Sequence, residues 1–86
     1  MAVEPIRARV DLIFGDMRTA QVVYQAISPD NHPLPRGLEL KAAFENTTIV
    51  MEIICHRPLQ SLLATLDDIL RMAALAENMA ETVRKL

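Results

Sequence analysis

The chain has 86 residues, a formal net charge of −2 and an apolar content of 51%, so it can form one domain with one small core. This net charge gives no overall basic field that would draw the chain onto nucleic acid. The apolar share is high for so short a chain, which predicts that part of the apolar surface covers a partner protein.

The cysteine content and the N-terminal sequence indicate the cellular compartment of the protein. Cys55 is the only cysteine, so no disulfide can form within the chain, which fits a reducing compartment. The first ten residues, MAVEPIRARV, lack the apolar core of a signal peptide. No apolar run approaches the ~20 residues of a membrane span. We therefore expect a cytoplasmic protein without membrane contact, folded as a single domain over residues 1–86.

The first half of the chain predicts a strand, a helix and a stiff loop. Residues 6–14 alternate between apolar and polar side chains, which is typical of a strand with one buried face. Gly15 ends this strand, and Asp16 is a good N-cap for a helix whose apolar residues follow helical spacing. Pro29 ends the helix within the segment SPDNHPLPRG, whose three prolines predict a stiff loop.

The second half predicts a β-hairpin followed by a long helix. Residues 38–44 and 48–56 alternate again and are joined by the short turn ENT. The second of these strands is apolar on both faces, so we expect it to be central or covered on both sides. Pro58 is well placed at the first position of a helix, and nothing interrupts the helical pattern from there to Lys85.

The element order strand-helix-strand-strand-helix predicts an α+β fold. The economical arrangement is a three-stranded antiparallel sheet with both helices on one face and a long C-terminal helix. The crossover rule then places the third strand between the first and the second. Leu12, Leu40, Ile53 and Leu66 should point into the interior between sheet and helices.

The apolar positions of the last helix change sides along its length. In the first half one face carries Leu59, Leu62, Leu63, Leu66, Ile69, Leu70 and Ala73. A second stripe, rotated by roughly a quarter to a third of a turn, carries Met72, Leu75, Ala76, Met79, Val83 and Leu86. At ~42 Å the helix is longer than strands of ~26 Å, so about ten helical residues should overhang the sheet.

The apolar overhang has two interpretations. It either folds back onto the first helix or forms an interface with another protein. The first helix is short and already faces the sheet, so we favour an interface in which methionines act as adaptable contacts. The predicted partner-interface residues are Met72, Leu75, Ala76, Met79 and Val83.

The sequence contains no pattern that predicts catalysis. Cys55 and His56 are adjacent on a strand and point to opposite faces, so they cannot pair as nucleophile and base. His32 lies in the proline loop, and two histidines with one cysteine at this spacing match no zinc pattern. Gly15 and Gly37 are isolated, so no phosphate-binding loop is present. We expect no enzyme activity, no catalytic residue, no cofactor and no metal site.

The arginines leave two interpretations open. Arg7 and Arg9 share one strand face, and Arg36 closes the proline loop. These side chains are either ordinary surface charge or a local basic patch suited to an RNA backbone. The chain has neither the glycine-rich clamp of a KH domain nor the aromatic pair of an RRM sheet.

Nearly the whole chain, from about Ile6 to Val83, resembles the small Pcc subunit of the KEOPS complex, which is related to the animal CTAG/LAGE proteins. The motifs that carry the resemblance are TAQVVYQAISPD after the opening strand, IVMEIICH in the hairpin and LQSLLATLDDILRM in the last helix. Arg36 ends the proline loop as in the family, and Arg71 stands at the arginine position of the last helix. Arg57, in contrast, stands where the family often has an acidic residue.

The resemblance implies a role in tRNA modification. KEOPS installs a threonylcarbamoyl group on the adenosine next to the anticodon of tRNAs that read codons beginning with A. The resemblance implies a non-catalytic subunit that dimerises, with itself or with a paralogue. It also implies that this subunit holds the catalytic ATP-binding subunit through a bundle of helices and contributes to tRNA binding. Arg7, Arg9 and Arg36 are then candidate tRNA contacts. A free-standing small RNA-binding module is the alternative.

Overall fold

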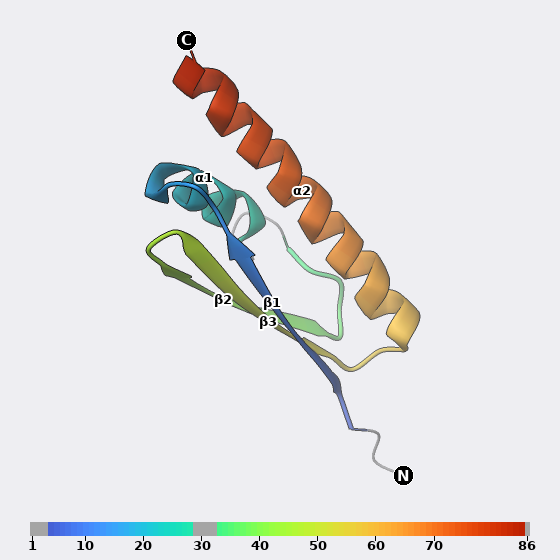
Figure 1. Ribbon diagram of the computed structural model, residues 1–86. Coiled ribbons are helices and arrows are strands. Elements are labelled where there is room, and N and C mark those ends of the chain that lie inside the picture. Colours follow the sequence, from blue (N-terminus) through green and yellow to red (C-terminus); the bar gives the residue numbers. More distant parts are fainter. Residues whose placement is uncertain (1–3, 29–32, 86) are drawn as a thin grey trace.

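The computed structural model describes residues 4–28 and 33–85 and has the predicted element order (Figure 1). The elements are β1 (Ile6–Ile13), α1 (Met17–Ile27), β2 (Leu38–Glu45), β3 (Thr48–Cys55) and α2 (Leu59–Lys85). Both helices lie on one face of the sheet, so the predicted α+β fold is confirmed. His32 and Leu86, which the sequence analysis placed in the proline loop and at the end of the second stripe, lie outside the described residues.

The sheet has three strands in the order β1-β3-β2, and β3 is antiparallel to both neighbours. The predicted central position of β3 is therefore confirmed. Ile6 of β1 and Leu38 of β2 both lie opposite Cys55 of β3. The starts of β1 and β2 and the end of β3 thus meet at one end of the sheet, which brings distant parts of the chain together.

Local interactions fix the ends of these elements. Asp16 is the N-cap of α1, and its Oδ1 accepts a hydrogen bond from the Thr19 amide at 2.7 Å. Asn46 has a φ of 54° in the tight turn between β2 and β3, a conformation that asparagine adopts more readily than most residues. The predicted cap and hairpin are both present.

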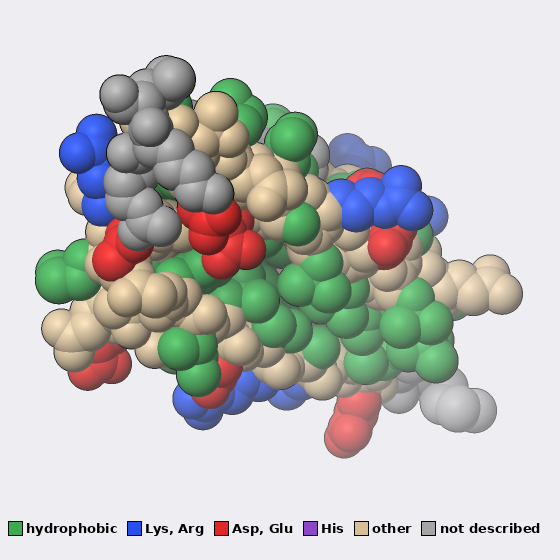
Figure 2. All heavy atoms as spheres, turned by 45° about the horizontal axis from the view of Figure 1, so that its top comes forward, with side chains coloured by type: hydrophobic (Ala, Val, Ile, Leu, Met, Phe, Trp, Pro, Cys, Tyr) green, Lys and Arg blue, Asp and Glu red, His purple; other side chains and the backbone are tan. Residues whose placement is uncertain are grey.

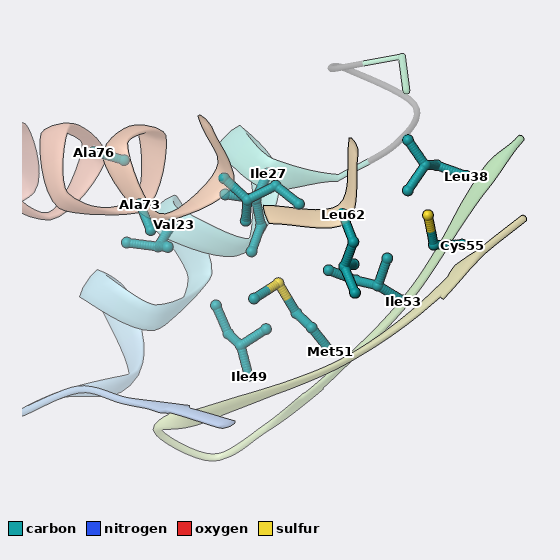
Figure 3. Close-up of a cluster of buried hydrophobic side chains, with 11 residues drawn as sticks. Val23, Ile27, Leu38, Ile49, Met51, Ile53, Cys55, Leu62, Ala73 and Ala76 are labelled. Atoms are coloured by element: carbon teal, nitrogen blue, oxygen red, sulfur yellow. The ribbon is translucent and has the colours of Figure 1, made fainter. Parts of the chain in front are cut away.

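The core lies between the helices and the inner face of the sheet (Figure 3). The largest fully buried side chains are Val23, Ile27, Ile49, Met51, Ile53, Cys55 and Ile69. Of the four residues predicted to point inward, Ile53 is fully buried. Leu12, Leu40 and Leu66 are half-buried and pack against the same core.

The buried face of α2 differs from the prediction. It runs straight through Leu62, Thr65, Ile69, Ala73 and Ala76, which are spaced three or four residues apart as on one face of a helix. The stripe of buried residues therefore does not rotate. The sequence pattern appeared to rotate because exposed apolar residues flank this straight stripe on one side in the first half of α2 and on the other side in the second half. In the first half these are Leu59, Leu63 and Leu70, which are 54%, 55% and 43% exposed and were expected to be buried.

Part of the predicted overhang of α2 packs against α1, which is the interpretation that the sequence analysis did not favour. Ala73 and Ala76 belong to the same buried cluster as Val23 of α1, so α1 packs against the second half of α2. Ala76 is only 7% exposed and Met72 is half-buried. Ala76 therefore belongs to the core, whereas Met72 packs against the core and stays half-exposed, so its interface role stays a prediction.

Candidate protein-binding surfaces

The side chains that could carry chemistry in the described residues are dispersed. No group of three or more His, Cys, Asp or Glu side chains among them could hold a metal ion. Cys55 is buried, and its Sγ lies 3.3 Å from the Arg57 carbonyl oxygen, to which the thiol donates. His56 is exposed and forms no pair with this thiol in the described structure. The surface features of the described residues are considered next.

Within the described ranges, no helix combines the length and the apolar character needed to cross a membrane.

The first surface, called here the Met79 surface, lies on the α1 flank of α2. It consists of Leu75, Met79 and Val83, which are 62%, 61% and 60% exposed. Arg18 and Val22 of α1 line a hollow together with Met79, Ala80 and Val83. Two of the predicted interface residues, Met79 and Val83, thus lie in a groove between the two helices, and Leu75 lies one turn before Met79 on the same flank of α2. The sequence analysis did not find the contribution of α1, because the position of one helix beside the other is a tertiary property.

The second surface, called here the β1 surface, lies on the opposite flank of α2. It consists of the inner-facing residues of β1, namely Ile6, Ala8, Val10 and Leu12, and of the α2 residues Leu59, Leu63 and Leu70. All four β1 residues are only half-buried. A groove lined by Leu12, Phe14, Leu70, Ala73 and Ala74 separates β1 from α2. Figure 2 shows hydrophobic side chains gathered across the middle of the face seen there, with charged residues mostly around them.

The β2 side of the sheet is better protected than the β1 side. The ring of Tyr24 in α1 lies 5.9 Å from the ring of Phe44 in β2, measured between centroids. The Tyr24 hydroxyl also donates a hydrogen bond to the Ala42 carbonyl oxygen at 3.3 Å. Leu38, at the start of β2, is buried. Helix α1 therefore covers β2, whereas no helix covers β1 in the same way.

The outer face of the sheet carries balanced charge. Arg9 of β1 and Lys41 of β2 both lie opposite Glu52 of β3. An Arg7 Nη1 lies 3.8 Å from a Glu52 Oε1, and the Arg9 Nε donates to the Asp11 Oδ1 at 3.2 Å. Exposed ion pairs of this kind add little stability, but they neutralise the field of the arginines. The middle of the sheet is therefore not a basic patch, although Arg7 and Arg9 share one face as predicted.

A basic group does form at one end of the sheet. Arg36 precedes β2, and His56 and Arg57 follow β3, so the strand register brings these exposed residues together. Arg7, opposite Ile54, lies at the same end. The Arg57 Nη1 donates to the Arg36 carbonyl oxygen at 3.4 Å, which leaves both guanidinium groups on the surface. Sequence reasoning missed Arg57, although the hairpin register alone would have placed it beside Arg36.

Comparisons with known proteins agree with this architecture. A protein-family model described as transcription factor Pcc1 matches residues 7–81. A chain in the crystal structure of the binary complex Gon7-Pcc1 superimposes with a TM-score of 0.74 over 91% of this chain and 95% of that chain, at 13% sequence identity. At this identity the structural likeness shows the fold. A search of curated protein sequences gave no match.

Proposed function

Because the chain belongs to the Pcc1 family of KEOPS subunits, we propose that it is a non-catalytic, dimerising scaffold that supports threonylcarbamoyladenosine formation in tRNA. In this proposal the chain binds the catalytic ATP-binding subunit and helps to hold tRNA. A cytoplasmic location is part of the proposal, supported by the lone buried thiol of Cys55.

The observation that carries the scaffold role is the Met79 surface. Leu75, Met79 and Val83 are spaced four residues apart, so they form one apolar row on a helix. None of the three is needed to cover the core, because the buried stripe of α2 lies beside them. The adjacent hollow is lined by α1 as well as α2, which suits the apolar face of a helix laid between them. We propose that the catalytic subunit supplies that helix.

The test compares the same substitution on the two flanks of α2. Met79→Asp should leave the circular dichroism spectrum and melting temperature of the chain unchanged. It should raise the Kd for the ATP-binding subunit by about 100-fold or more, because an unpaired carboxylate would be buried in the interface. Leu70→Asp, on the β1 flank, is the matched control and should bind the ATP-binding subunit normally. Full affinity of the Met79→Asp chain would refute this interface.

We propose that tRNA is contacted at the basic end of the sheet. Arg36 and Arg7 were predicted from the sequence as tRNA contacts, and both lie at this end. Arg57 and His56 are added because they lie at the same end and are exposed. Arg9 is less suited, because Asp11 and Glu52 lie beside it. The net charge of −2 predicts weak binding by the isolated chain, so the contact should matter within the assembled complex.

The tRNA contact is tested in the assembled complex. Changing Arg36 and Arg57 together to Ala should weaken tRNA binding and reduce the slope of log K against log salt by about one to two, because two phosphate contacts are lost. Assembly with the ATP-binding subunit should be unaffected. The control is Lys41→Ala, which removes a cation that lies opposite Glu52 in the middle of the sheet. If the isolated chain binds RNA as tightly as the complex does, a free-standing RNA-binding module describes it better.

A further inference from the structure

We infer that the chain binds one unpaired guanine base of an RNA strand in a hollow beside Asp68. The inference rests on the proposed tRNA contact and goes further by naming the base, its position and the residue that selects it. The hollow, called here the Asp68 hollow, lies between Pro35, Leu38 and the first half of α2, where the chain entering β2 runs beside that helix (Figure 1). Its volume is about 190 Å³. Drug-sized ligands occupy pockets of about 300–1,000 Å³, so this hollow suits a smaller group such as a single base.

One side of the Asp68 hollow is a polar row on α2. Ser61, Thr65 and Asp68 are spaced four and three residues apart, so they share one face of the helix, and all three line the hollow. The two hydroxyl groups can donate or accept hydrogen bonds, whereas the Asp68 carboxylate only accepts. Within residues 4–28 and 33–85 this carboxylate has no ion-pair or hydrogen-bond partner, although that of the adjacent Asp67 pairs with the Arg71 Nε at 3.1 Å. The Asp68 carboxylate is therefore available to a ligand.

The rest of the lining suits the flat faces of a base. Pro35, Leu38 and Ala64 supply apolar contact surface. Arg57 also lines the hollow, and a guanidinium plane can stack on a nucleobase. Proteins hold an unstacked base through contacts with its ring faces and hydrogen bonds to its edge, and the Asp68 hollow offers both.

Arg57 connects the Asp68 hollow to the basic end of the sheet. Its Nη1 donates to the Arg36 carbonyl oxygen at 3.4 Å. A nucleotide with its base in the hollow would therefore have its phosphate near these two arginines. Asp68 would repel a phosphate, so its carboxylate is unsuited to the RNA backbone. It is suited to the N–H groups on the edge of a base.

The Asp68 carboxylate selects guanine among the four bases. Guanine presents two adjacent donors on its Watson–Crick edge, N1–H and the N2 amino group, and the two oxygens of a carboxylate can accept from both. Adenine and cytosine present one donor beside an acceptor, and uracil presents one donor between two acceptors. In a base pair the guanine donors are already used, so the base must come from a loop, a bulge or an end of the RNA.

Nuclear magnetic resonance titration of the full chain with short single-stranded RNA tests the base. The probes are oligouridylates with one central guanosine, inosine or adenosine. The guanosine probe should bind about tenfold more tightly than the adenosine probe and should shift the amide signals of Ser61, Thr65 and Asp68. Inosine lacks the N2 amino group and should bind with intermediate affinity. Equal affinity for the three probes would overturn the guanine site.

Free guanosine monophosphate distinguishes an RNA site from a nucleotide site. It carries the same base but lacks the neighbouring phosphates, which the basic end of the sheet would contact. It should shift the same signals and bind at least about tenfold more weakly than the guanosine probe. If it binds as tightly as that probe, RNA is the wrong ligand.

A matched pair of substitutions tests the selecting residue. Asp68→Asn should remove the preference for guanosine, because a carboxamide offers one donor and one acceptor. Asp67→Asn changes the net charge equally at an exposed neighbouring position outside the hollow, and it should keep the preference. Ala64→Leu adds bulk at an exposed position in the lining and should weaken binding of the guanosine probe at least about fivefold without lowering the melting temperature. A preference that survives Asp68→Asn would overturn the assignment.

The failure of this inference can be told from the failure of the proposed tRNA contact. If the probes show no preference while the double change of Arg36 and Arg57 to Ala still weakens tRNA binding by the complex, the Asp68 hollow is wrong and the tRNA contact stands. If that double change leaves tRNA binding intact, the tRNA contact fails. Selective binding of the guanosine probe, lost in Asp68→Asn, would then still support a guanine site in the hollow.

Discussion

Gly37 leaves the space that the Arg57 side chain occupies at the basic end of the sheet. Its φ of 91° lies in the left-handed region that favours glycine. A Cβ at this position would lie 2.9 Å from the Arg57 Cγ. The Gly37 carbonyl oxygen also accepts a hydrogen bond from the His56 amide at 2.8 Å. A small residue with an unusual backbone conformation therefore lets the Arg57 side chain cross the start of β2 and reach Arg36.

Gly37→Ala should lower the free energy of unfolding by about 1–2 kcal/mol, because the left-handed conformation is costly for alanine and the new methyl group displaces Arg57. Urea denaturation checks this value. Gly15→Ala is the control, since nothing lies within 4 Å of a Cβ at Gly15 and its φ is not in the left-handed region. Equal effects of the two substitutions would show that the contact with Arg57 and the φ of Gly37 do not matter.

Ile53→Ala should lower the free energy of unfolding by about 2–5 kcal/mol, because Ile53 is fully buried in the centre of the core and its removal leaves a cavity. This is a large part of the stability of a small domain. Ile13→Ala serves as control, since Ile13 is 76% exposed and should lose less than about 0.5 kcal/mol. A loss below that value for Ile53→Ala in urea denaturation would contradict the assigned core.

Helix α2 shows which properties of an element can be predicted from sequence and which cannot. Alternation predicted the three strands, and capping residues predicted the helix starts, to within one or two residues of the observed bounds. The buried face of α2 could not be found in the same way. Leu62 and Leu63 are equally apolar neighbours, and only the position of the sheet and α1 decides that Leu62 is 4% exposed and Leu63 is 55% exposed.

The candidate site was predictable to the same limited degree. Leu75, Met79 and Val83 could be found because they are apolar in the second half of the last helix, which extends beyond the predicted sheet. Ala76 was misassigned because alanine is compatible with a surface and with a close helix–helix contact, and sequence does not tell which applies. Arg57 was missed because its neighbour in space, Arg36, is 21 residues away in the chain and is brought near by the hairpin.

The corrected assignment of α2 can be tested with two adjacent residues. Ala76→Asp should destabilise the isolated chain by roughly 1–3 kcal/mol or more, because it places a carboxylate in the contact with α1. Leu75→Asp should change the stability by less than about 0.5 kcal/mol, because Leu75 is 62% exposed. Thermal and urea unfolding of both variants give the comparison. The opposite order would mean that the buried face of α2 has been assigned to the wrong side.

The described part of the molecule is elongated, with principal extents of 56 × 20 × 18 Å, and its two candidate surfaces differ in chemistry. Both surfaces are mostly apolar, but Arg18 lines the Met79 surface, whereas Arg9 and Asp11 lie on the outer face of the strand that borders the β1 surface. They lie on opposite flanks of α2, so two partners can bind at once without competing for the same residues.

The Met79 surface and the basic end of the sheet should respond differently to salt. Raising the ionic strength from about 0.05 M to 0.5 M should weaken tRNA binding by the assembled complex, because contacts of Arg36 and Arg57 with phosphates are screened within a Debye length that falls well below 10 Å. The affinity for the ATP-binding subunit should change much less, because burial of apolar area does not depend on screening. Sedimentation and calorimetry over a salt series measure the two effects. A steep loss of affinity at the Met79 surface would show that Arg18, and not the apolar row, dominates it.

The central position of β3 also determines when the sheet can be completed during synthesis. Strands β2 and β3 are joined by a short turn and can pair as soon as both exist, but β1 is made first and pairs only with β3. Ile6 waits for Cys55, about 50 residues later, which is several seconds at typical rates of translation. The first strand of the nascent sheet therefore waits longest for its strand partner, because Leu38 also pairs with Cys55 but is made much later than Ile6. During that interval the apolar face of β1 has no sheet or helix of the finished fold to cover it, which exposes it to aggregation.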